Sequence, residues 1–278
     1  MNLHGALLPK GDEKVNRNQL LSALKSLINY HAVCGIEQYP VADDVLEQLV
    51  GMERRKADER NALPRLEKVR SASIGKVKSV PLPSGGTVFS GDMRALKERV
   101  KACCRCSLCQ SRHFSSAGKG GERPVLLIIG DWLAVDNSCG QEAIFGRDQD
   151  AMLSKMISAI QLAEKDVYIT NTVKCTVPEH KQPTKEHIES CAFYLYSQIE
   201  MLVPKVICTM GIIPTRLLIG RTQPLSRQRG RFFPFRTQSG LEIPLMPTYH
   251  PTFLLRNGEM KKETWKDLQA IQEVIGQN

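Results

Sequence analysis

The hydrophobic pattern changes twice along the chain and divides it into three regions. Residues 18–31 carry leucine and isoleucine at helical intervals, which predicts an amphipathic helix. Residues 52–90 are charged at first and then rich in Gly, Ser and Pro, and they show no sustained periodicity. We therefore predict a helical N-terminal extension over residues 1–51, a basic linker over 52–90 and a folded domain over 91–278. We interpret the linker as a solvated tether, with a DNA-binding arm as the alternative.

Apolar strands and amphipathic helices alternate through the third region. The predicted strands cover residues 124–130, 166–173, 205–211 and 242–249. The predicted helices cover residues 92–103, 150–162, 184–203, 213–220 and 263–275. Unbroken apolar strands separated by helices are typical of a parallel sheet that is covered on both faces. The pattern thus predicts an α/β fold, a three-layer α/β/α sandwich around a central, mostly parallel sheet.

Polar residues and glycines stand where each of the predicted strands ends. They are Gly130 with Asp131, Asn171, Gly211 and His250. The carboxyl ends of parallel strands lie at one edge of a sheet, and ligands of such sheets bind in the crevice outside that edge. The sequence therefore predicts that these residues meet at a single active site.

Composition supports one large domain and adds a candidate partner. The chain has 278 residues, of which 42% are hydrophobic, enough for one sizeable core with an appendage. Its 38 basic and 29 acidic side chains give a formal net charge of +9, which favours polyanionic partners. Nucleic acid is the commonest such partner, although charge alone does not identify it.

No segment of the sequence is typical of a secretion signal or a membrane span. The first residues hold no sustained apolar run, and no later stretch approaches the roughly 20 apolar residues that a spanning helix needs. We therefore expect a cytoplasmic protein without a membrane partner. In a reducing compartment, an odd count of nine cysteines favours metal ligation over a disulfide framework.

Four of these cysteines are spaced as metal ligands. Cys103 and Cys106 form a CxxC pair, and Cys175 and Cys191 lie far downstream, so the fold must bring the two pairs together. CxxC lets two thiolates bind one metal centre from a single turn. The alternative is four unrelated buried thiols, because free cysteine is commonly buried. Basic residues around the first pair suit a cluster of thiolates, and we predict a buried metal cluster.

Several motifs together resemble the family 4 uracil-DNA glycosylases, the iron-sulfur members of that superfamily. They are VYITNTVKC at 167–175, the spacing from Cys175 to Cys191, PTYHPTFLLRN at 247–257 and the upstream CxxC. Their shared order extends over roughly residues 92–275. The resemblance implies an enzyme that extrudes uracil from DNA and hydrolyses its N-glycosidic bond, leaving an abasic site.

The resemblance also implies the catalytic groups. Asn171 reads the pairing edge of the flipped base, because a side-chain amide offers a donor and an acceptor together. His250 donates a hydrogen bond to the departing uracil, whose ring gains negative charge in the transition state. Asp131 is the acidic residue expected to act on the attacking water, with Asp136 as the alternative.

Further roles follow from the same resemblance. The base pocket is expected to include Gly130, Trp132, Ile144 and Phe145, in addition to Asn171. DNA contacts are expected from the residues Leu254, Leu255, Arg256 and Arg229. Leu254 and Leu255 are expected to wedge between base steps and Arg256 to meet phosphate, although the two leucines could equally begin a helix that faces the core.

For the four cysteines, the resemblance implies a 4Fe-4S cluster bound by Cys103, Cys106, Cys175 and Cys191. Four thiolates also suit tetrahedral zinc, which is the alternative. Cys104 and Cys109 are further cysteines close to the first pair. Aligning Arg112 with the family's arginine selects Cys103 and Cys106 over them.

The first motif departs from the family's pattern. Family members carry Gly-Glu-Ala/Gly-Pro-Gly after the first strand, whereas this chain reads Gly130, Asp131, Trp132, Leu133 and Ala134. In one interpretation Trp132 replaces the aromatic ring that stacks on uracil, and the chain remains a glycosylase for uracil or a related deaminated base. In the other, chemistry is lost and the fold serves as a DNA-binding or assembly protein.

We expect a monomer that binds DNA. A third interpretation adds a protein partner, bound through the N-terminal extension, within a repair or replication assembly.

Overall fold

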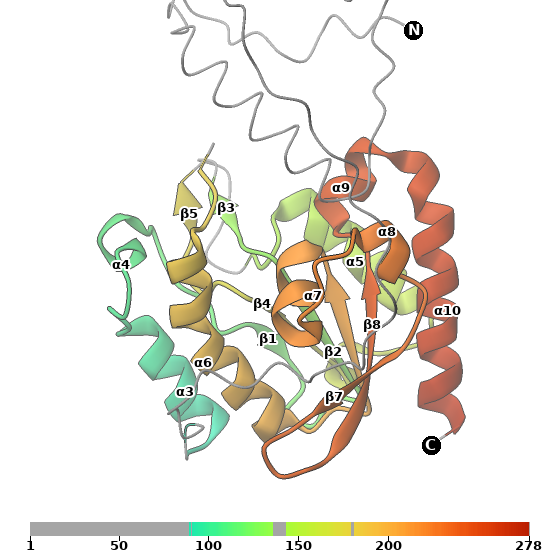
Figure 1. Cartoon of the computed structure of the whole chain (residues 1–278), viewed down its shortest axis with the longest axis horizontal. Coiled ribbons are helices and arrows are strands. Elements are labelled where there is room, and N and C mark those ends of the chain that lie inside the picture. The colour runs from blue at the N-terminus through green and yellow to red at the C-terminus, as the bar shows by residue number, and fades with distance from the viewer. Residues whose placement is uncertain (1–88, 90, 136–142, 179–180, 278) are drawn as a thin grey trace, which may run out of the picture.

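The computed structural model describes residues 89, 91–135, 143–178 and 181–277 (Figure 1). The predicted N-terminal extension lies outside the described residues, as does the predicted linker except for residue 89. Asp136 lies outside them too, so its predicted role in orienting water stays a prediction.

A six-stranded sheet forms the centre of the molecule, with the strand order β1-β4-β2-β6-β8-β7. Its strands are β1 (Lys119–Gly120), β2 (Leu126–Gly130), β4 (Val167–Asn171), β6 (Val206–Met210), β7 (Phe233–Arg236) and β8 (Glu242–Thr248). The four inner strands run parallel, and the outer strands β1 and β7 are antiparallel to their neighbours. A separate parallel pair joins β3 (Ala134–Val135) to β5 (Val177–Pro178). The prediction of a mostly parallel sheet is confirmed.

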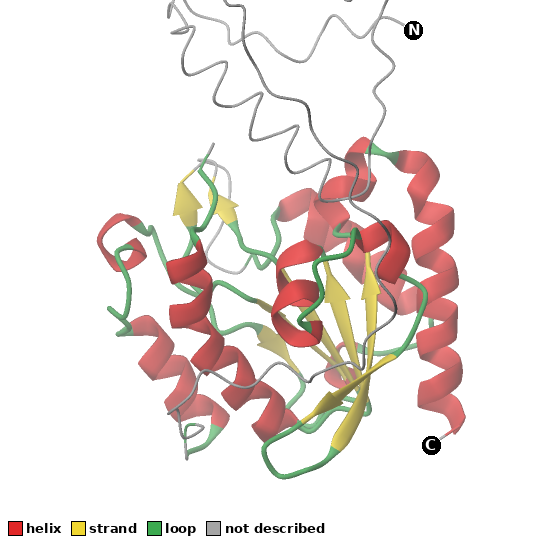
Figure 2. Ribbon diagram, in the orientation of Figure 1, coloured by secondary structure: helices red, strands yellow, loops and turns green. Residues whose placement is uncertain are grey.

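Helices cover both faces of the sheet (Figure 2). They are α3 (Met93–Lys101), α4 (Leu108–Ser111), α5 (Arg147–Ala159), α6 (Lys185–Leu202), α7 (Ile212–Ile219), α8 (Leu225–Gln228), α9 (Pro251–Arg256) and α10 (Lys261–Gln277), with single 3-10 turns η1 (Glu164–Asp166) and η2 (Gly258–Met260). None of the helices in the described part of the chain is long and apolar enough to cross a membrane.

The core divides into two layers because side chains alternate across a strand. Leu126 and Ile128 of β2 pack with residues of α5 and α10 on one face. Leu127 and Ile129 pack with residues of α6 and α7 on the other. Two apolar layers around one sheet make the predicted three-layer sandwich.

Two further elements lie near the strand ends. Residues 233–236, which were not among the predicted strands, form an antiparallel edge strand that pairs with β8 after a turn through Gly240, whose φ is +87°. The segment after His250 forms the short helix α9, in line with the alternative that Leu254 and Leu255 belong to a helix. His250 caps this helix through its side chain, and Pro251 occupies the first helical position, where a missing N–H costs nothing.

Candidate active site

The carboxyl ends of four parallel strands bring the predicted site residues to one edge of the sheet. Gly130 ends β2 and pairs in register with Asn171, which ends β4. Gly130 permits a close approach, since a Cβ there would stand 2.2 Å from the Phe145 ring and 2.6 Å from Oδ1 of Asn171. No other residue fits this position without moving its neighbours.

Asn171 is buried and only half satisfied. Its Nδ2 donates a hydrogen bond to the carbonyl of Ile144, and its Oδ1 is buried without a hydrogen-bond partner in the described part of the chain. Buried polar atoms are nearly always paired, so each exception calls for an explanation. An acceptor that is held ready at the strand edges is what a ligand with an N–H group would satisfy.

His250 presents a second unpaired polar atom. Its Nδ1 accepts a hydrogen bond from the backbone N–H of Thr252, 3.2 Å away, so the neutral ring carries its proton on Nε2. Nε2 is buried and has no partner among the residues that the structure describes. Burial lowers the pKa of His250 to about 3, which keeps the ring neutral at physiological pH. The Phe145 ring lies against it, with 4.7 Å between the ring centroids.

Asp131 lies next to Gly130 and is turned toward the end of β6. Its Oδ1 accepts a hydrogen bond of 3.0 Å from the backbone N–H of Ile213 in the first turn of α7. Gly211, with φ of +107°, makes room for the carboxyl group, because a Cβ there would stand 2.3 Å from Oδ2 of Asp131. Burial raises the pKa of Asp131 to about 7, with the Ile213 hydrogen bond opposing the shift.

The aromatic side chain at the strand edge is Phe145, and the structure does not place Trp132 beside it. Trp132 packs with the buried group that contains Cys175 and Cys191, and its indole Nε1 is buried without a partner. The interpretation that Trp132 replaces the stacking ring stays a prediction. Ile144, the other predicted pocket residue, is buried in the core and supplies the carbonyl that Asn171 binds.

The four predicted ligand cysteines lie beside α3, α4 and α6, with Cys103 packed against a different apolar group from the other three. Cys106, Cys175 and Cys191 belong to one apolar group with Leu108. The pKa of the Cys175 thiol is raised mainly by burial and further by its neighbours Cys106 and Cys103. Nη1 of Arg112 donates to Sγ of Cys175 at 3.2 Å, which matches the expected arginine beside the ligands. Thiolate sulfur is the type of donor that such a metal cluster takes.

Two other cysteines lie close by but pair with each other. The thiol of Cys109 is hydrogen-bonded to Cys104, and this bond is the main cause of its raised pKa. Within the described residues, no three His, Cys, Asp or Glu side chains are close enough together to hold a single metal ion.

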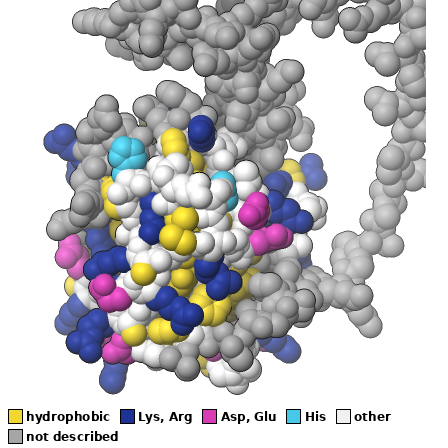
Figure 3. All heavy atoms as spheres, turned by 90° about the vertical axis from the view of Figure 1, so that its left-hand side faces the viewer, with side chains coloured by type: hydrophobic (Ala, Val, Ile, Leu, Met, Phe, Trp, Pro, Cys, Tyr) yellow, Lys and Arg dark blue, Asp and Glu magenta, His cyan; other side chains and the backbone are white. Residues whose placement is uncertain are grey.

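Basic side chains are spread over the face of the molecule on which α3 and α4 lie (Figure 3).

A buried lysine, which we did not single out from the sequence, links the cysteines to Asn171. Nζ of Lys174 donates to Oγ1 of Thr170 at 2.8 Å, to the carbonyl of Asn171 at 2.6 Å and to Oε1 of Gln198 at 2.5 Å. Burial lowers the pKa of Lys174 to about 7. The sequence feature that could have identified Lys174 is its position as a charged residue in the otherwise apolar segment that leads to Cys175.

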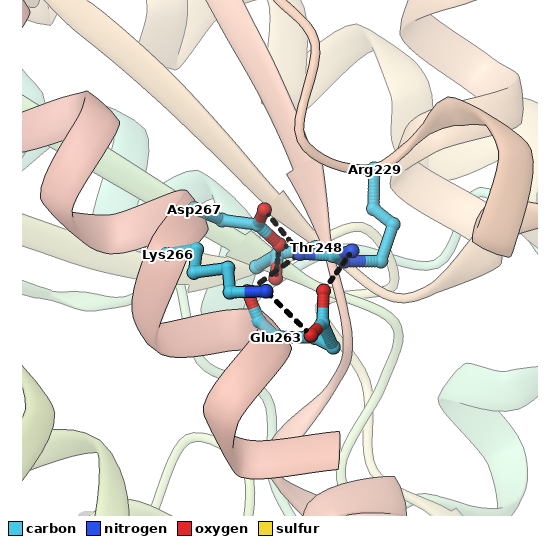
Figure 4. Close-up of polar contacts among 5 residues, drawn as sticks. All are labelled: Arg229, Thr248, Glu263, Lys266 and Asp267. Atoms are coloured by element: carbon cyan, nitrogen blue, oxygen red, sulfur yellow. Dashed lines mark hydrogen bonds and ion pairs between the residues drawn. The ribbon is translucent and has the colours of Figure 1, made fainter.

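Arg229 is engaged inside the protein, and its predicted contact with DNA stays a prediction. Its guanidinium donates to both carboxylate oxygens of Asp267, at 3.0 and 2.5 Å, and to Oε2 of Glu263 at 3.1 Å (Figure 4). Oδ2 of Asp267 also accepts from Oγ1 of Thr248 at 2.6 Å, and the guanidinium lies over the ring of Tyr249. Arg229 thus braces the two residues that precede His250.

The predicted DNA wedge is divided between the inside and the outside of the molecule. Leu254 is fully buried with Phe253 and Tyr249, so it cannot enter DNA, and that prediction is corrected. The helical path of α9 turns Leu255 outward, where 43% of its surface is exposed. Arg256 is exposed beside it. The sequence spacing alone could not distinguish the two leucines.

The fold and these residues define an α/β/α protein with a buried polar site at the carboxyl ends of its parallel strands. The model of the Uracil DNA glycosylase superfamily matches residues 117–269, and the chain belongs to this superfamily.

Curated relatives agree with this assignment. A Type-4 uracil-DNA glycosylase of Pyrobaculum aerophilum is 31% identical over 182 residues, which is 64% of this chain and 91% of the relative. One of Sulfurisphaera tokodaii is 29% identical over 66% of this chain and 84% of the relative. One of Thermotoga maritima is 28% identical over 66% of this chain and 94% of the relative.

Proposed function

We propose that the protein is a uracil-DNA glycosylase that hydrolyses the N-glycosidic bond of uracil in DNA during base-excision repair. The observation that carries the proposal is the pair of buried, unpartnered atoms Oδ1 of Asn171 and Nε2 of His250 at the carboxyl edge of the sheet. The names of the curated relatives support the same activity. A flipped base supplies the hydrogen-bonding partners that both atoms lack.

His250 supplies the catalytic hydrogen bond. Bond cleavage leaves negative charge on the uracil ring, and a neutral imidazole with its proton on Nε2 donates to the ring oxygen where that charge collects. Such a donor is worth more in the transition state than in the ground state, and removing one typically slows an enzyme by about 100-fold or more. The cap that holds Nδ1 fixes which nitrogen carries the proton.

Asp131 is the acidic group that we propose to orient the attacking water. Its carboxyl group lies directly after Gly130 at the strand edge, and the hydrogen bond from Ile213 holds it in place. A pKa near 7 suits a general base, because its proton affinity then matches the pH at which it works. Gly130 and Phe145 shape the space that the base and sugar would enter.

DNA would lie against the outer end of α9. Exposed Leu255 is the apolar side chain available to fill the gap that the flipped base leaves, and Arg256 beside it can meet phosphate. Both follow His250 within a single short helix, so the wedge and the catalytic donor are fixed relative to each other.

The metal proposal assigns a 4Fe-4S cluster to Cys103, Cys106, Cys175 and Cys191. Support comes from the neighbouring thiols, from Arg112 and from the type-4 relatives. When bound, the cluster would tie the start of the domain to the segment that follows β4. Lys174 then connects that tie to Asn171, since its Nζ binds the Asn171 carbonyl.

In the decisive experiment, the protein is incubated with labelled DNA that contains uracil, hypoxanthine or xanthine. Alkali-labile strand scission at uracil is the expected result, and His250→Leu should reduce it by about 100-fold or more. DNA binding without an abasic product, whichever base is offered, would overturn the proposed activity in favour of a binding or assembly role.

Absorbance tests the cluster. Anaerobically purified protein should show visible absorbance, and Cys175→Ser should lose both metal and solubility. Cys104→Ser is the control, because Cys104 is exposed and outside the assigned ligand set. A colourless, zinc-loaded wild type would refute the iron assignment, and a soluble, folded, colourless Cys175→Ser protein would refute the structural role.

We propose that the protein is a cytoplasmic monomer. Its relatives are named as enzymes that act on DNA, and its free thiols suit a reducing compartment. A protein partner would bind through residues 1–51.

A further inference from the structure

An apolar groove runs between α5 and α10 and ends at α9. It encloses about 500 Å³, within the range of sites that hold small organic groups. Met152 and Met156 of α5 form one wall, Trp265 and Leu268 of α10 form the other, and Leu255 of α9 lies at its end. None of these residues belongs to the polar site at the strand edge.

We propose that this groove binds unpaired nucleotides of the DNA strand that passes the catalytic site. The inference rests on the proposed function, because it takes DNA as the substrate. It adds a second contact region on the same strand, outside the catalytic pocket, whose ligand is an unstacked nucleobase with its phosphate.

The lining suits a nucleobase. Trp265 is 36% exposed, so part of its indole is open at the groove. A base stacks on an aromatic ring whatever its identity, because every base has a π face. The two methionine thioethers are polarizable and adapt to flat rings. Such a groove binds single strands without reading their sequence.

The charges suit phosphate. Lys155 and Lys261 line the groove, and neither forms an ion pair with any residue that the structure describes. Asp148 is the only acid among the groove's described lining residues. Arg256 is exposed next to Leu255 and adds a further cation at the same end. Cations along an aromatic groove are the combination found in single-strand binding sites.

The groove is continuous with the proposed DNA contact. Leu255 belongs to both, since it is the exposed residue of α9 and also part of the groove lining. Helix α9 begins directly after His250 and packs against α5. A strand that passes from the catalytic histidine over Leu255 would therefore reach the groove next.

An amphipathic helix is the main competing occupant, and the charges argue against the one this chain could supply. The segment 18–31 carries apolar residues at helical spacing but contains no aspartate or glutamate. Its charged side chain is the cation Lys25, so it offers no acid to pair with Lys155 and Lys261. DNA offers the phosphates that this segment lacks.

The test uses the full chain and a fluorescently labelled, undamaged oligothymidylate. Trp265→Ala should weaken binding roughly tenfold, since stacking on one aromatic ring is worth about that factor. The double variant Lys155→Glu, Lys261→Glu should weaken binding as well and flatten its dependence on salt. Lys205→Glu is the matched control, because Lys205 is exposed just before β6, at the opposite edge of the sheet.

Two results would overturn the inference. One is binding by the groove variants that equals binding by the Lys205→Glu control. The other concerns Trp265 fluorescence, measured in a Trp132→Phe background because the chain has two tryptophans. If acrylamide fails to quench it without DNA but quenches it after Leu24→Asp, segment 18–31 occupies the groove. Excision of uracil from a short duplex is measured in parallel. If the wild type binds DNA through Trp265 but excises no uracil, the proposed activity is rejected and the groove proposal stands. If the wild type excises uracil normally but Trp265→Ala leaves DNA binding unchanged, the groove proposal is rejected and the activity stands.

Discussion

Asp131 links the chemistry of the site to the stability of the fold. Burial raises the pKa of its carboxyl group from 3.8 to about 7, so the folded protein binds a proton that the unfolded chain releases over this interval. The associated stability is therefore complete below about pH 4 and is lost as pH rises through about 7. Excision should change in the opposite direction, because only the ionised carboxylate can act as a base.

Asp131→Asn should separate these two effects. The amide can still accept the hydrogen bond from Ile213, so we expect the variant to unfold at a higher temperature than wild type at pH 8 and to excise uracil much more slowly. Thermal unfolding and excision at pH 5 and pH 8 measure both quantities. If wild type and variant change equally in stability between pH 5 and pH 8, Asp131 does not bind a proton in the folded protein as expected.

His250 should contribute no pH dependence of its own near neutrality. Because burial lowers its pKa to about 3, the ring stays neutral throughout the usual assay range. The slow residual excision by Asp131→Asn should therefore be flat between about pH 5 and 8, where an ordinary histidine would titrate. A fall of that residual rate below about pH 6.5 would show that His250 takes up a proton there.

At the scale of elements, Asp267 of α10 joins two parts of the fold: its ion pair holds Arg229, which follows α8, and its hydrogen bond holds Thr248, which ends β8. Asp267 is 2% exposed and binds both Arg229 and Thr248, and Thr248 and Tyr249 lead directly into His250. Removing one partner leaves the other charge buried and unpaired, which typically costs about 3–5 kcal/mol. The brace should therefore affect both the stability of the domain and the position of the catalytic histidine.

Arg229→Met is expected to lower the free energy of unfolding and the excision rate together. Arg229→Lys should restore part of each, since lysine keeps the charge but not the two-pronged contact. Denaturant unfolding and single-turnover excision provide the measurements. Arg236→Met is the control, because the pair between Arg236 and Glu242 is exposed on the outer hairpin. If Arg229→Met and Arg236→Met have equal effects, the contacts of Arg229 neither stabilise the domain nor position His250.

The whole molecule shows which features a sequence can predict. The sheet and its two covered faces follow from apolar runs that end in polar residues, and the structure confirms them. The shared active site of Gly130, Asn171 and His250, which the same runs predict, stays a prediction. Side-chain direction does not follow from such a pattern. Trp132 and Leu254 point into the protein, and their directions depend on contacts made by residues distant in the chain.

Charge at the scale of the molecule leads to a prediction about residues 1–90. If the basic linker is a tether, as we propose, deleting residues 1–90 should leave the affinity for DNA and its salt dependence unchanged. The same deletion should abolish binding of a protein partner. Titrations of labelled duplex at several salt concentrations measure the first effect, and a shallower salt slope for the shortened protein would show that the linker contacts phosphate.

The unpaired oxygen of Asn171 has a consequence for how uracil is told from cytosine. Nδ2 already has a partner in the Ile144 carbonyl, so a base that takes its place exchanges one hydrogen bond for another and gains little. Oδ1 has no hydrogen bond to a described residue that a bound base would have to replace. Uracil offers it the N3 hydrogen, whereas cytosine would set a lone pair against a lone pair in a site closed to water. Rejection of the normal base would thus depend on the repulsion at a single oxygen atom more than on the attraction of the correct one.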